Sequence, residues 1–169
     1  VENPYVPEVW VSDVWDAAWL LGIDGVGLSA ADVGSGGGLP GIVLAMFAKE
    51  HRPDMQFRLV ESDQRRCAFL RNATREIGLN VKVHAERNEL LDPTGANGSS
   101  ARALTDMNGL LEFVERHSAE NSIAILPKGE TWEKEILQDQ ENWSFEYEEI
   151  TSKTNNNAAI LKIKEFARV

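Results

Sequence analysis

The sequence predicts an α/β fold, a doubly wound, Rossmann-like sheet that is mostly parallel and ends in an antiparallel hairpin. Short apolar runs alternate along the chain with segments of helical periodicity, which is typical of parallel β–α units. A glycine-rich turn joins the apolar run at residues 28–33 to the helical segment that follows. Near the end, extended patterns at residues 143–147 and 160–163 follow each other with only a loop between them, as in a hairpin.

The helices of this fold are expected where apolar residues recur three or four positions apart. They are placed at residues 9–21, from 40 onward, 63–78, 104–116 and 131–140. Pro40 suits a first helical turn, because its missing N–H would have no partner there. Asp63 is a predicted N-cap and Gly78 a predicted C-terminal stop.

The strands are expected in short apolar or alternating runs. These are residues 28–33, 57–61, 81–84 and 123–126, followed by the two strands of the hairpin. The run at 123–126 is continuously apolar, which predicts an interior strand. Residues 92–100 are rich in Gly, Pro, Asn and Ser and predict a loop.

Length and composition predict one domain. We expect a helical segment at residues 1–27 and a single α/β domain at residues 28–169. The one cysteine, Cys67, excludes a disulfide within this sequence and favours a reducing, cytoplasmic location. We expect Cys67 to be a small core residue rather than a nucleophile. One Cys and three scattered His show no zinc-ligand spacing, so no metal is expected.

The most informative motif is the glycine-rich turn, residues 32–41, which read DVGSGGGLPG. Glycines let a ligand approach the backbone closely, and the following helix directs its first N–H groups at that ligand. The dinucleotide pattern G-x-G-x-x-G is broken, because Leu39 stands at the third glycine position. The pattern D-x-G-x-G-x-G instead resembles the first motif of S-adenosyl-L-methionine (SAM) methyltransferases. Gly34 and Gly36 are therefore candidate cofactor contacts, and a structural turn or an NAD(P) loop is the alternative.

An acidic residue supports a nucleotide site. Glu61 ends the strand predicted at 57–61, and an acid about 20 residues beyond such glycines can bind ribose hydroxyls. The net charge of −10 argues against a nucleic-acid substrate, because phosphate contacts depend on Lys and Arg. The local distribution is uneven, however. Acids crowd residues 130–149, and the helix predicted at 63–78 carries Arg65, Arg66, Arg71 and Arg75.

Four motifs in the same order resemble the RsmG (GidB) family. They are residues 32–45 (DVGSGGGLPGIVLA), 60–71 (VESDQRRCAFLR), 101–104 (ARAL) and 126–129 (LPKG). The resemblance implies a bacterial methyltransferase that uses SAM to methylate N7 of one guanine in 16S rRNA. It therefore implies the small ribosomal subunit as partner, a cytoplasmic location and no membrane. We expect the protein to act as a monomer.

The resemblance also implies site residues. Matched position by position, the SAM contacts fall on Gly34, Leu39, Asn88, Glu89 and Arg102, to which the motif analysis adds Gly36 and Glu61. Arg102 is in addition a candidate for substrate positioning, because its planar guanidinium suits bidentate contacts. Lys128, Arg65 and Arg66 are candidates for RNA binding, since Lys128 is predicted at the ligand-binding rim of the sheet.

Two departures from the family pattern keep alternatives open. The family has a longer N-terminal helical segment, so we expect this chain to begin inside it. Where the family has an apolar fourth strand, this chain has Asn97, Gly98, Ser99 and Ser100, which predicts a weak strand. A small-molecule SAM methyltransferase and a non-catalytic SAM-binding protein therefore remain as alternatives.

Methylation of guanine N7 requires little acid–base chemistry from the protein. SAM carries an electrophilic methyl group, and N7 has a free lone pair and no proton to lose. No general base is required, and alignment of the reacting atoms is the main task. The chain also lacks the Asn/Asp-Pro-Pro-aromatic motif used for exocyclic amines.

Overall fold

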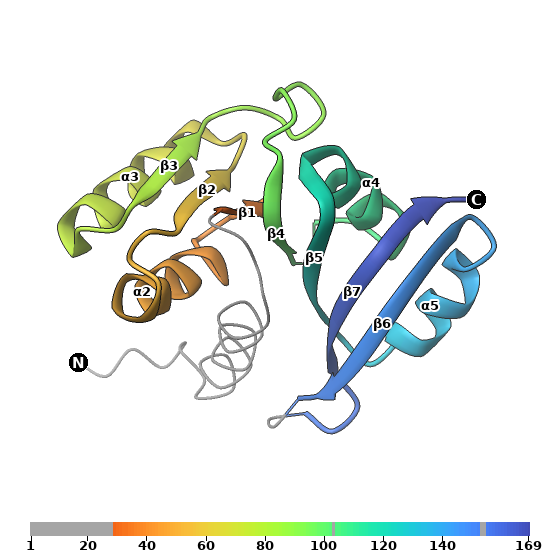
Figure 1. The fold of residues 1–169 in the computed structure, drawn as a ribbon. Coiled ribbons are helices and arrows are strands. Elements are labelled where there is room, and N and C mark those ends of the chain that lie inside the picture. Colours follow the sequence, from red (N-terminus) through yellow and green to blue (C-terminus); the bar gives the residue numbers. More distant parts are fainter. Residues whose placement is uncertain (1–28, 103, 153–154) are drawn as a thin grey trace.

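The computed structural model describes residues 29–102, 104–152 and 155–169 (Figure 1). The helical segment expected at residues 1–27 lies outside the described residues. The described strands form one seven-stranded sheet in the order β3-β2-β1-β4-β5-β7-β6. Its strands are β1 (Ser29–Val33), β2 (Gln56–Val60), β3 (Val81–His84), β4 (Ala96–Ala101), β5 (Ser118–Lys128), β6 (Trp143–Thr151) and β7 (Ala159–Arg168).

The strand directions confirm the predicted fold class. Strand β1 pairs in parallel with both β2 and β4, and the pairs β2–β3 and β4–β5 are also parallel. Strand β7 runs antiparallel to its two neighbours, β5 and β6, so the C-terminal pair forms the expected hairpin. The helices are α2 (Gly41–His51), α3 (Gln64–Ile77), α4 (Met107–His117) and α5 (Trp132–Asp139).

Helices cover both faces of the sheet, and β5 shows why. Its side chains alternate: Ile123 and Ile125 belong to a core cluster with α2, whereas Ala124 and Leu126 belong to a cluster with α4 and α5. A strand covered on both faces buries the side chains of both, which favours apolar residues at successive positions and explains the continuous apolar run in the sequence. Figure 1 shows α2 on one side of the sheet and α4 and α5 on the other.

The helix ends follow local chemistry that the sequence shows. Asp63 caps α3, because its Oδ1 accepts the N–H groups of Arg65 and Arg66 at 2.9 Å each. Gly78 ends α3 in the left-handed conformation, at φ 70°. Both predicted ends are confirmed. Helix α4 begins three residues later than expected, because Asp106 is its cap and accepts the N–H of Gly109 at 2.9 Å.

The expected loop at residues 92–100 is confirmed only for residues 92–95; residues 96–100 belong to strand β4, so the expectation of a loop there and of a weak fourth strand is wrong. Strand β4 lies in the middle of the sheet and is almost entirely buried. Its polar side chains are paired: the hydroxyl oxygens of Ser99 and Ser118 lie 3.0 Å apart, and Ser100 donates to Oδ1 of Asp32 at 2.6 Å. Buried hydroxyls with partners are tolerated in a sheet, and this pairing is invisible in sequence.

None of the helices in the described residues combines the length and the apolar composition needed to cross a bilayer. No group of three or more His, Cys, Asp or Glu in the described part of the chain is arranged to hold a metal ion.

Candidate cofactor and substrate site

A pocket of about 580 Å³ lies at the carboxyl ends of the central strands. Its residues follow β1 (Gly34), β2 (Glu61), β3 (Asn88) and β4 (Arg102). The chain reverses its direction of travel across the sheet at β1, which lies between β2 and β4. This switch point is where open α/β sheets bind ligands, and the volume lies in the usual range for small-molecule sites.

We call the side of the pocket formed by residues 34–37, 39, 60–62 and 66 the glycine wall. Within it, Ser35 is held in place by two hydrogen bonds: its N–H donates to the carbonyl of Val60 at 2.9 Å, and its hydroxyl to the carbonyl of Asp32 at 2.8 Å. Gly34 has φ +68°, and a Cβ there would lie 2.7 Å from Cδ2 of Leu104. Only glycine suits such a position, so the loop keeps bare backbone at the pocket.

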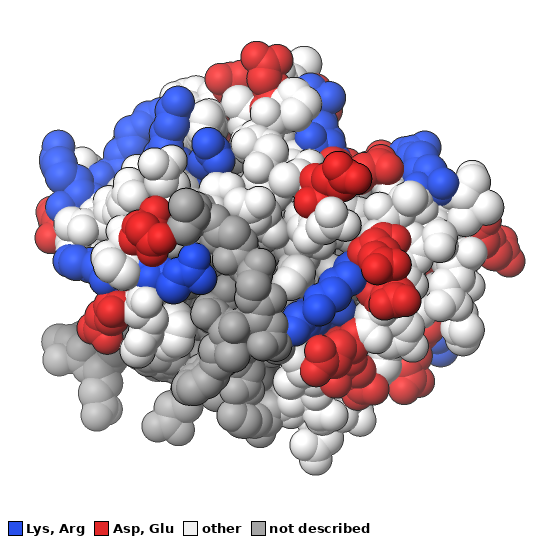
Figure 2. Space-filling model, in the orientation of Figure 1, with Lys and Arg blue, Asp and Glu red and all other residues white. Residues whose placement is uncertain are grey.

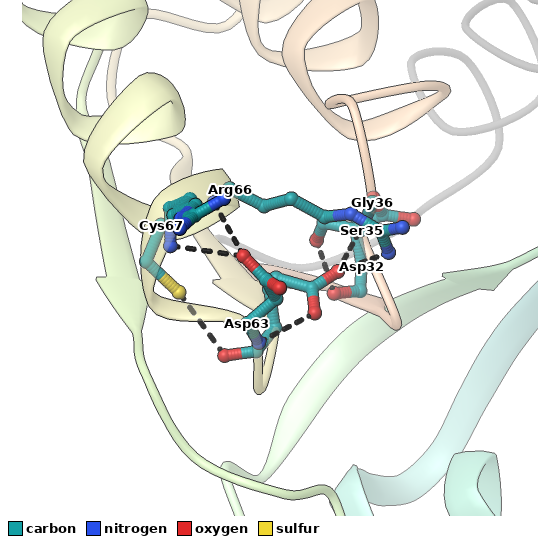
Figure 3. A network of polar contacts seen from close by, with 8 residues as sticks. Asp32, Ser35, Gly36, Asp63, Arg66 and Cys67 are labelled. Atoms are coloured by element: carbon teal, nitrogen blue, oxygen red, sulfur yellow. Dashed lines mark hydrogen bonds and ion pairs between the residues drawn. The ribbon is translucent and has the colours of Figure 1, made fainter.

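Glu61 connects the glycine turn to the start of helix α3 through its bonds to Gly36 and Asp63, which are labelled in Figure 3. Its Oε2 accepts the N–H of Gly36 at 2.8 Å, and its Oε1 accepts the N–H of Asp63 at 2.9 Å. The guanidinium of Arg66 lies 3.7 Å from Oε2. An ionised carboxylate has about four acceptor sites. Glu61 therefore keeps acceptor capacity directed at the pocket that it lines, which fits the two hydroxyls of a ribose.

Asp32 lies below the glycine turn and is 1% exposed. Burial raises the pKa of its carboxyl group from near 3.8 to about 6, against the opposing effect of the hydrogen bond from Ser100. The positive charge of Arg102 also acts to lower this pKa. Asp32 thus links the glycine turn to strand β4, on the opposite side of β1 from Glu61.

We call the opposite side of the pocket, formed by residues 86–89, 102, 104, 105, 109, 112 and 113, the α4 wall. Its loop is attached to the end of α4: Nε2 of His117 lies 2.9 Å from the carbonyl oxygen of Asn88, and Arg116 donates twice to the carbonyl of Leu91. His117 is fully buried, and burial lowers the pKa of its ring. A neutral ring that faces a carbonyl must donate from Nε2. These bonds determine where Asn88 and Glu89 stand.

The pocket brings together every residue that the sequence predicts to contact the cofactor. These are Gly34, Gly36, Leu39, Glu61, Asn88, Glu89 and Arg102. Among the RNA-binding candidates, Arg66 also lines the pocket, whereas Arg65 lies beside it on the exposed face of α3. Lys128 is not part of this pocket. Its Nζ lies 2.5 Å from Oε2 of Glu135 in α5, an ion pair that accounts for its charge without RNA.

The structure adds pocket residues that sequence reasoning missed. They come from the start of α4 and the turn before it: Leu104, Thr105, Gly109, Glu112 and Phe113. A signal existed for three of them, because positions 109, 112 and 113 share one face of a helix. No local pattern marks Leu104 and Thr105, which reach the pocket only because β4 and α4 pack beside β1. Cys67, as expected, is buried; its thiol lies 3.1 Å from the carbonyl oxygen of Glu61.

Comparison with known proteins shows the family of this chain. A family model described as GidB, rRNA small subunit methyltransferase G, matches residues 2–163. This chain belongs to the GidB family. A relative from Ruegeria sp. (strain TM1040), named Ribosomal RNA small subunit methyltransferase G, is 45% identical over 169 residues, which are 100% of this chain and 82% of the relative. A relative of the same name from Paracoccus denitrificans (strain Pd 1222) is 48% identical over 136 residues, 80% of this chain and 68% of the relative.

Solved structures share the fold of this GidB family member at low sequence identity. A SAM-dependent methyltransferase from Aquifex aeolicus has a TM-score of 0.69 at 12% identity, covering 97% of this chain and 93% of that one. TYW2 from M. jannaschii, solved in complex with AdoMet, has a TM-score of 0.67 at 11% identity, covering 99% and 80%. The resemblance predicted from the four sequence motifs is confirmed by the family match.

Proposed function

We propose that this protein transfers the methyl group of SAM to N7 of a guanine in the 16S rRNA of the small ribosomal subunit. The observation that carries the proposal is the position of the pocket. It lies on the D-x-G-x-G-x-G turn of a chain whose whole length matches relatives named small-subunit rRNA methyltransferases. Family membership supports the reaction, and the pocket supports the use of SAM.

The residues of the pocket fit SAM. Glu61 offers acceptors for ribose hydroxyls, while Gly34 and Gly36 leave the backbone bare where a ligand must come close. Asn88 and Glu89 stand on the α4 wall, across the pocket from the glycine turn. When bound, SAM supplies an electrophilic methyl group on a positively charged sulfur. We propose that these residues hold the donor so that this methyl group faces the substrate side of the pocket.

The residues of this chain then need only to orient the guanine. N7 has a lone pair and no proton, so no side chain must act as a general base. Arg102 directly follows β4 and lines the pocket, and its planar guanidinium suits O6 of a guanine or a neighbouring phosphate. We propose Arg102 as the residue that positions the base. Arg66 stands on the other side of the pocket and, with Arg65, is proposed to contact RNA.

One alternative has a specific observation in its favour. The net charge of −10 suits a small-molecule substrate better than RNA, because phosphate binding requires local positive charge. A non-catalytic SAM-binding protein would use the same pocket. Both alternatives predict that the protein binds SAM but transfers no methyl group to rRNA.

The test is transfer of labelled methyl from SAM to small ribosomal subunits isolated from cells that lack this modification. We expect the label at N7 of one guanine of 16S rRNA. Arg102→Ala should lower the rate of methyl transfer by more than it lowers the free energy of unfolding, because Arg102 is half-buried and lines the pocket. SAM binding by calorimetry, measured on the same preparation, is the control for a folded pocket.

A SAM-binding preparation that leaves both assembled subunits and free 16S rRNA unlabelled would refute the proposal. Labelling of an exocyclic amine rather than N7 would refute the proposed chemistry and keep the rRNA substrate.

A further inference from the structure

We propose that the exposed face of helix α3 is the surface on which the RNA docks. We call this surface the α3 face and define it by Arg65, Arg66, Phe69, Arg71 and Arg75. The inference deepens the proposed function and rests on it, since it identifies how an acidic protein holds a polyanionic substrate. The occupant that we infer is rRNA with its phosphates on the arginines and an unpaired base on Phe69.

The first argument is the distribution of charge. Residues 41–84, which run from α2 to β3, contain eight Lys and Arg and five Asp and Glu. The whole chain contains 17 Lys and Arg and 27 Asp and Glu. This part of the molecule is therefore positive, and the rest carries more than the whole net charge of −10. Figure 2 shows Lys and Arg gathered over α3 and the neighbouring sheet edge, while Asp and Glu dominate the opposite side. RNA approaching this molecule is steered to one side.

The second argument is how little of α3 is buried. Its buried residues are Cys67, Leu70 and Thr74, a single stripe at helical spacing. All four arginines of the helix are exposed. Two of them hydrogen-bond to neutral oxygens: Arg71 donates to the carbonyl of Val83 at 3.4 Å, and Arg75 to Oδ1 of Asn72 at 3.1 Å. Such partners orient a guanidinium and leave its charge and most of its five donors available to phosphate.

The third argument is an exposed aromatic side chain among these arginines. Phe69 is 56% exposed, although it lies on a helix with a buried stripe. It stands four residues after Arg65 and therefore on the same side of the helix. Proteins that bind single-stranded nucleic acid combine cationic side chains with aromatic rings on which bases stack. Phe69 has this combination with Arg65 and Arg66, at i−4 and i−3, whereas Arg71 and Arg75 lie on the other flank of the exposed surface.

The fourth argument is continuity with the pocket. Arg66 lines the pocket and contacts Glu61, so the α3 face begins at the site itself (Figure 3). From Arg66 to Arg75 the helix extends about 14 Å and makes about two and a half turns, so these two arginines lie on opposite flanks of the exposed surface. Nucleotides beside the target guanine would therefore cross α3 from one flank to the other while the target enters the pocket.

The test compares the full-length double variant Arg71→Glu/Arg75→Glu with the control Lys134→Glu/Lys164→Glu. Both make the same change in net charge at exposed positions, but the control residues lie on α5 and β7. Neither pair lines the pocket. We measure SAM affinity by calorimetry, the dissociation constant for protein-free 16S rRNA, and KM and kcat for methylation of small subunits.

We expect the α3 variant to raise the RNA dissociation constant and the KM at least tenfold, with kcat and SAM affinity unchanged. The control should change each value less than threefold. Replacement of the same two arginines by alanine should reduce the slope of log affinity against log salt by about 1.4 to 1.8, the effect of two lost phosphate contacts. Equal weakening in both charge-reversal variants, or unchanged RNA binding in the α3 variant, would overturn the inference.

A second comparison tests stacking. Phe69→Ala should weaken RNA binding by about fivefold to a hundredfold, the usual effect of removing one stacking ring. Phe69→Trp should retain binding, and Tyr147→Ala, which removes an aromatic ring 43% exposed on β6, should have no effect. Loss of binding in the Tyr147 variant, or none in Phe69→Ala, would refute the role of Phe69.

The outcomes also separate this inference from the proposed function. If the α3 variant methylates 16S rRNA with a normal KM, the proposed function stands and the docking surface is rejected. RNA binding that depends on α3, without methyl transfer by the wild type, keeps the docking surface and rejects the function. A wild type that neither binds nor methylates 16S rRNA rejects both.

Discussion

The two walls of the pocket are built in different ways. The glycine wall is held by bonds between residues close in sequence or on adjacent strands, such as those from Gly36 and Asp63 to Glu61. The α4 wall depends on contacts across the fold, where His117 at the end of a helix holds the carbonyl of Asn88, 29 positions earlier. The first wall can therefore be recognised as a motif, whereas the part of the second wall that α4 contributes exists only after the helix has docked.

The largest expected effect is on the glycine wall. Gly34→Val should weaken SAM binding at least a hundredfold, because the new side chain is strained at φ +68° and collides with Leu104. Gly129→Val is the control, since Gly129 lies outside the pocket and a Cβ there meets no atom within 4 Å. Calorimetry with SAM measures both. Equal losses in the two variants would show that the effect is not specific to the pocket, and an unaffected Gly34 variant would contradict the site.

A substitution on the α4 wall tests the contact across the fold. His117→Ala should lower the free energy of unfolding by about 2 to 3 kcal/mol, because it leaves a cavity and a carbonyl without its donor. It should also weaken SAM binding about tenfold through displacement of Asn88. His117→Gln can place a donor near the same carbonyl and should restore part of the SAM affinity.

Hydrogen exchange at residues 88–91 measures this displacement directly. Faster exchange confined to these residues is expected in His117→Ala. Uniformly faster exchange over the whole chain would mean that His117 serves only general stability.

Glu61→Gln tests whether the glycine wall needs a carboxylate. A glutamine has one acceptor oxygen, so it cannot serve both N–H groups that Glu61 now accepts. We expect SAM affinity to fall about tenfold, in line with about 1.5 kcal/mol for a hydrogen bond to a charged group. Glu50→Gln, on the exposed surface of α2, is the control. Equal affinity in wild type and Glu61→Gln would exclude Glu61 from the ribose site.

The smallest expected effect concerns Asp32 in β1, whose Oδ1 accepts a hydrogen bond from Ser100 in the neighbouring strand β4. Burial raises its pKa to about 6, so its contribution to stability is present at low pH and is lost as pH rises through 6. Between pH 7.5 and pH 5 the wild type should therefore gain about 1 kcal/mol relative to Asp32→Asn. Denaturant unfolding at the two pH values measures this difference.

Protonation of His117 has the opposite effect on the free energy of unfolding. Because burial lowers the pKa of His117, the protein loses stability as pH falls. That effect is common to the wild type and Asp32→Asn and cancels between them. An identical pH dependence in both proteins would contradict the raised pKa of Asp32.

The sequence alone determined the features that depend on neighbouring residues. The caps of α3 at Asp63 and Gly78, the glycine turn and the acid at the end of β2 are all local chemistry, and each lies where it was predicted. The alternation of strands and helices sufficed for the fold class, because every β–α unit carries its own pattern.

Tertiary structure decided the rest, for a physical reason that β4 illustrates. Residues 97–100 have little intrinsic preference for a strand, and they form one because Asp32 and Ser118 provide partners for their hydroxyls at the centre of the sheet. The α4 wall, with Leu104, Thr105 and the bond from His117, likewise depends on groups brought together from distant parts of the chain. Hydrogen bonds between residues far apart in sequence leave no pattern in it, so they could be found only in the folded molecule.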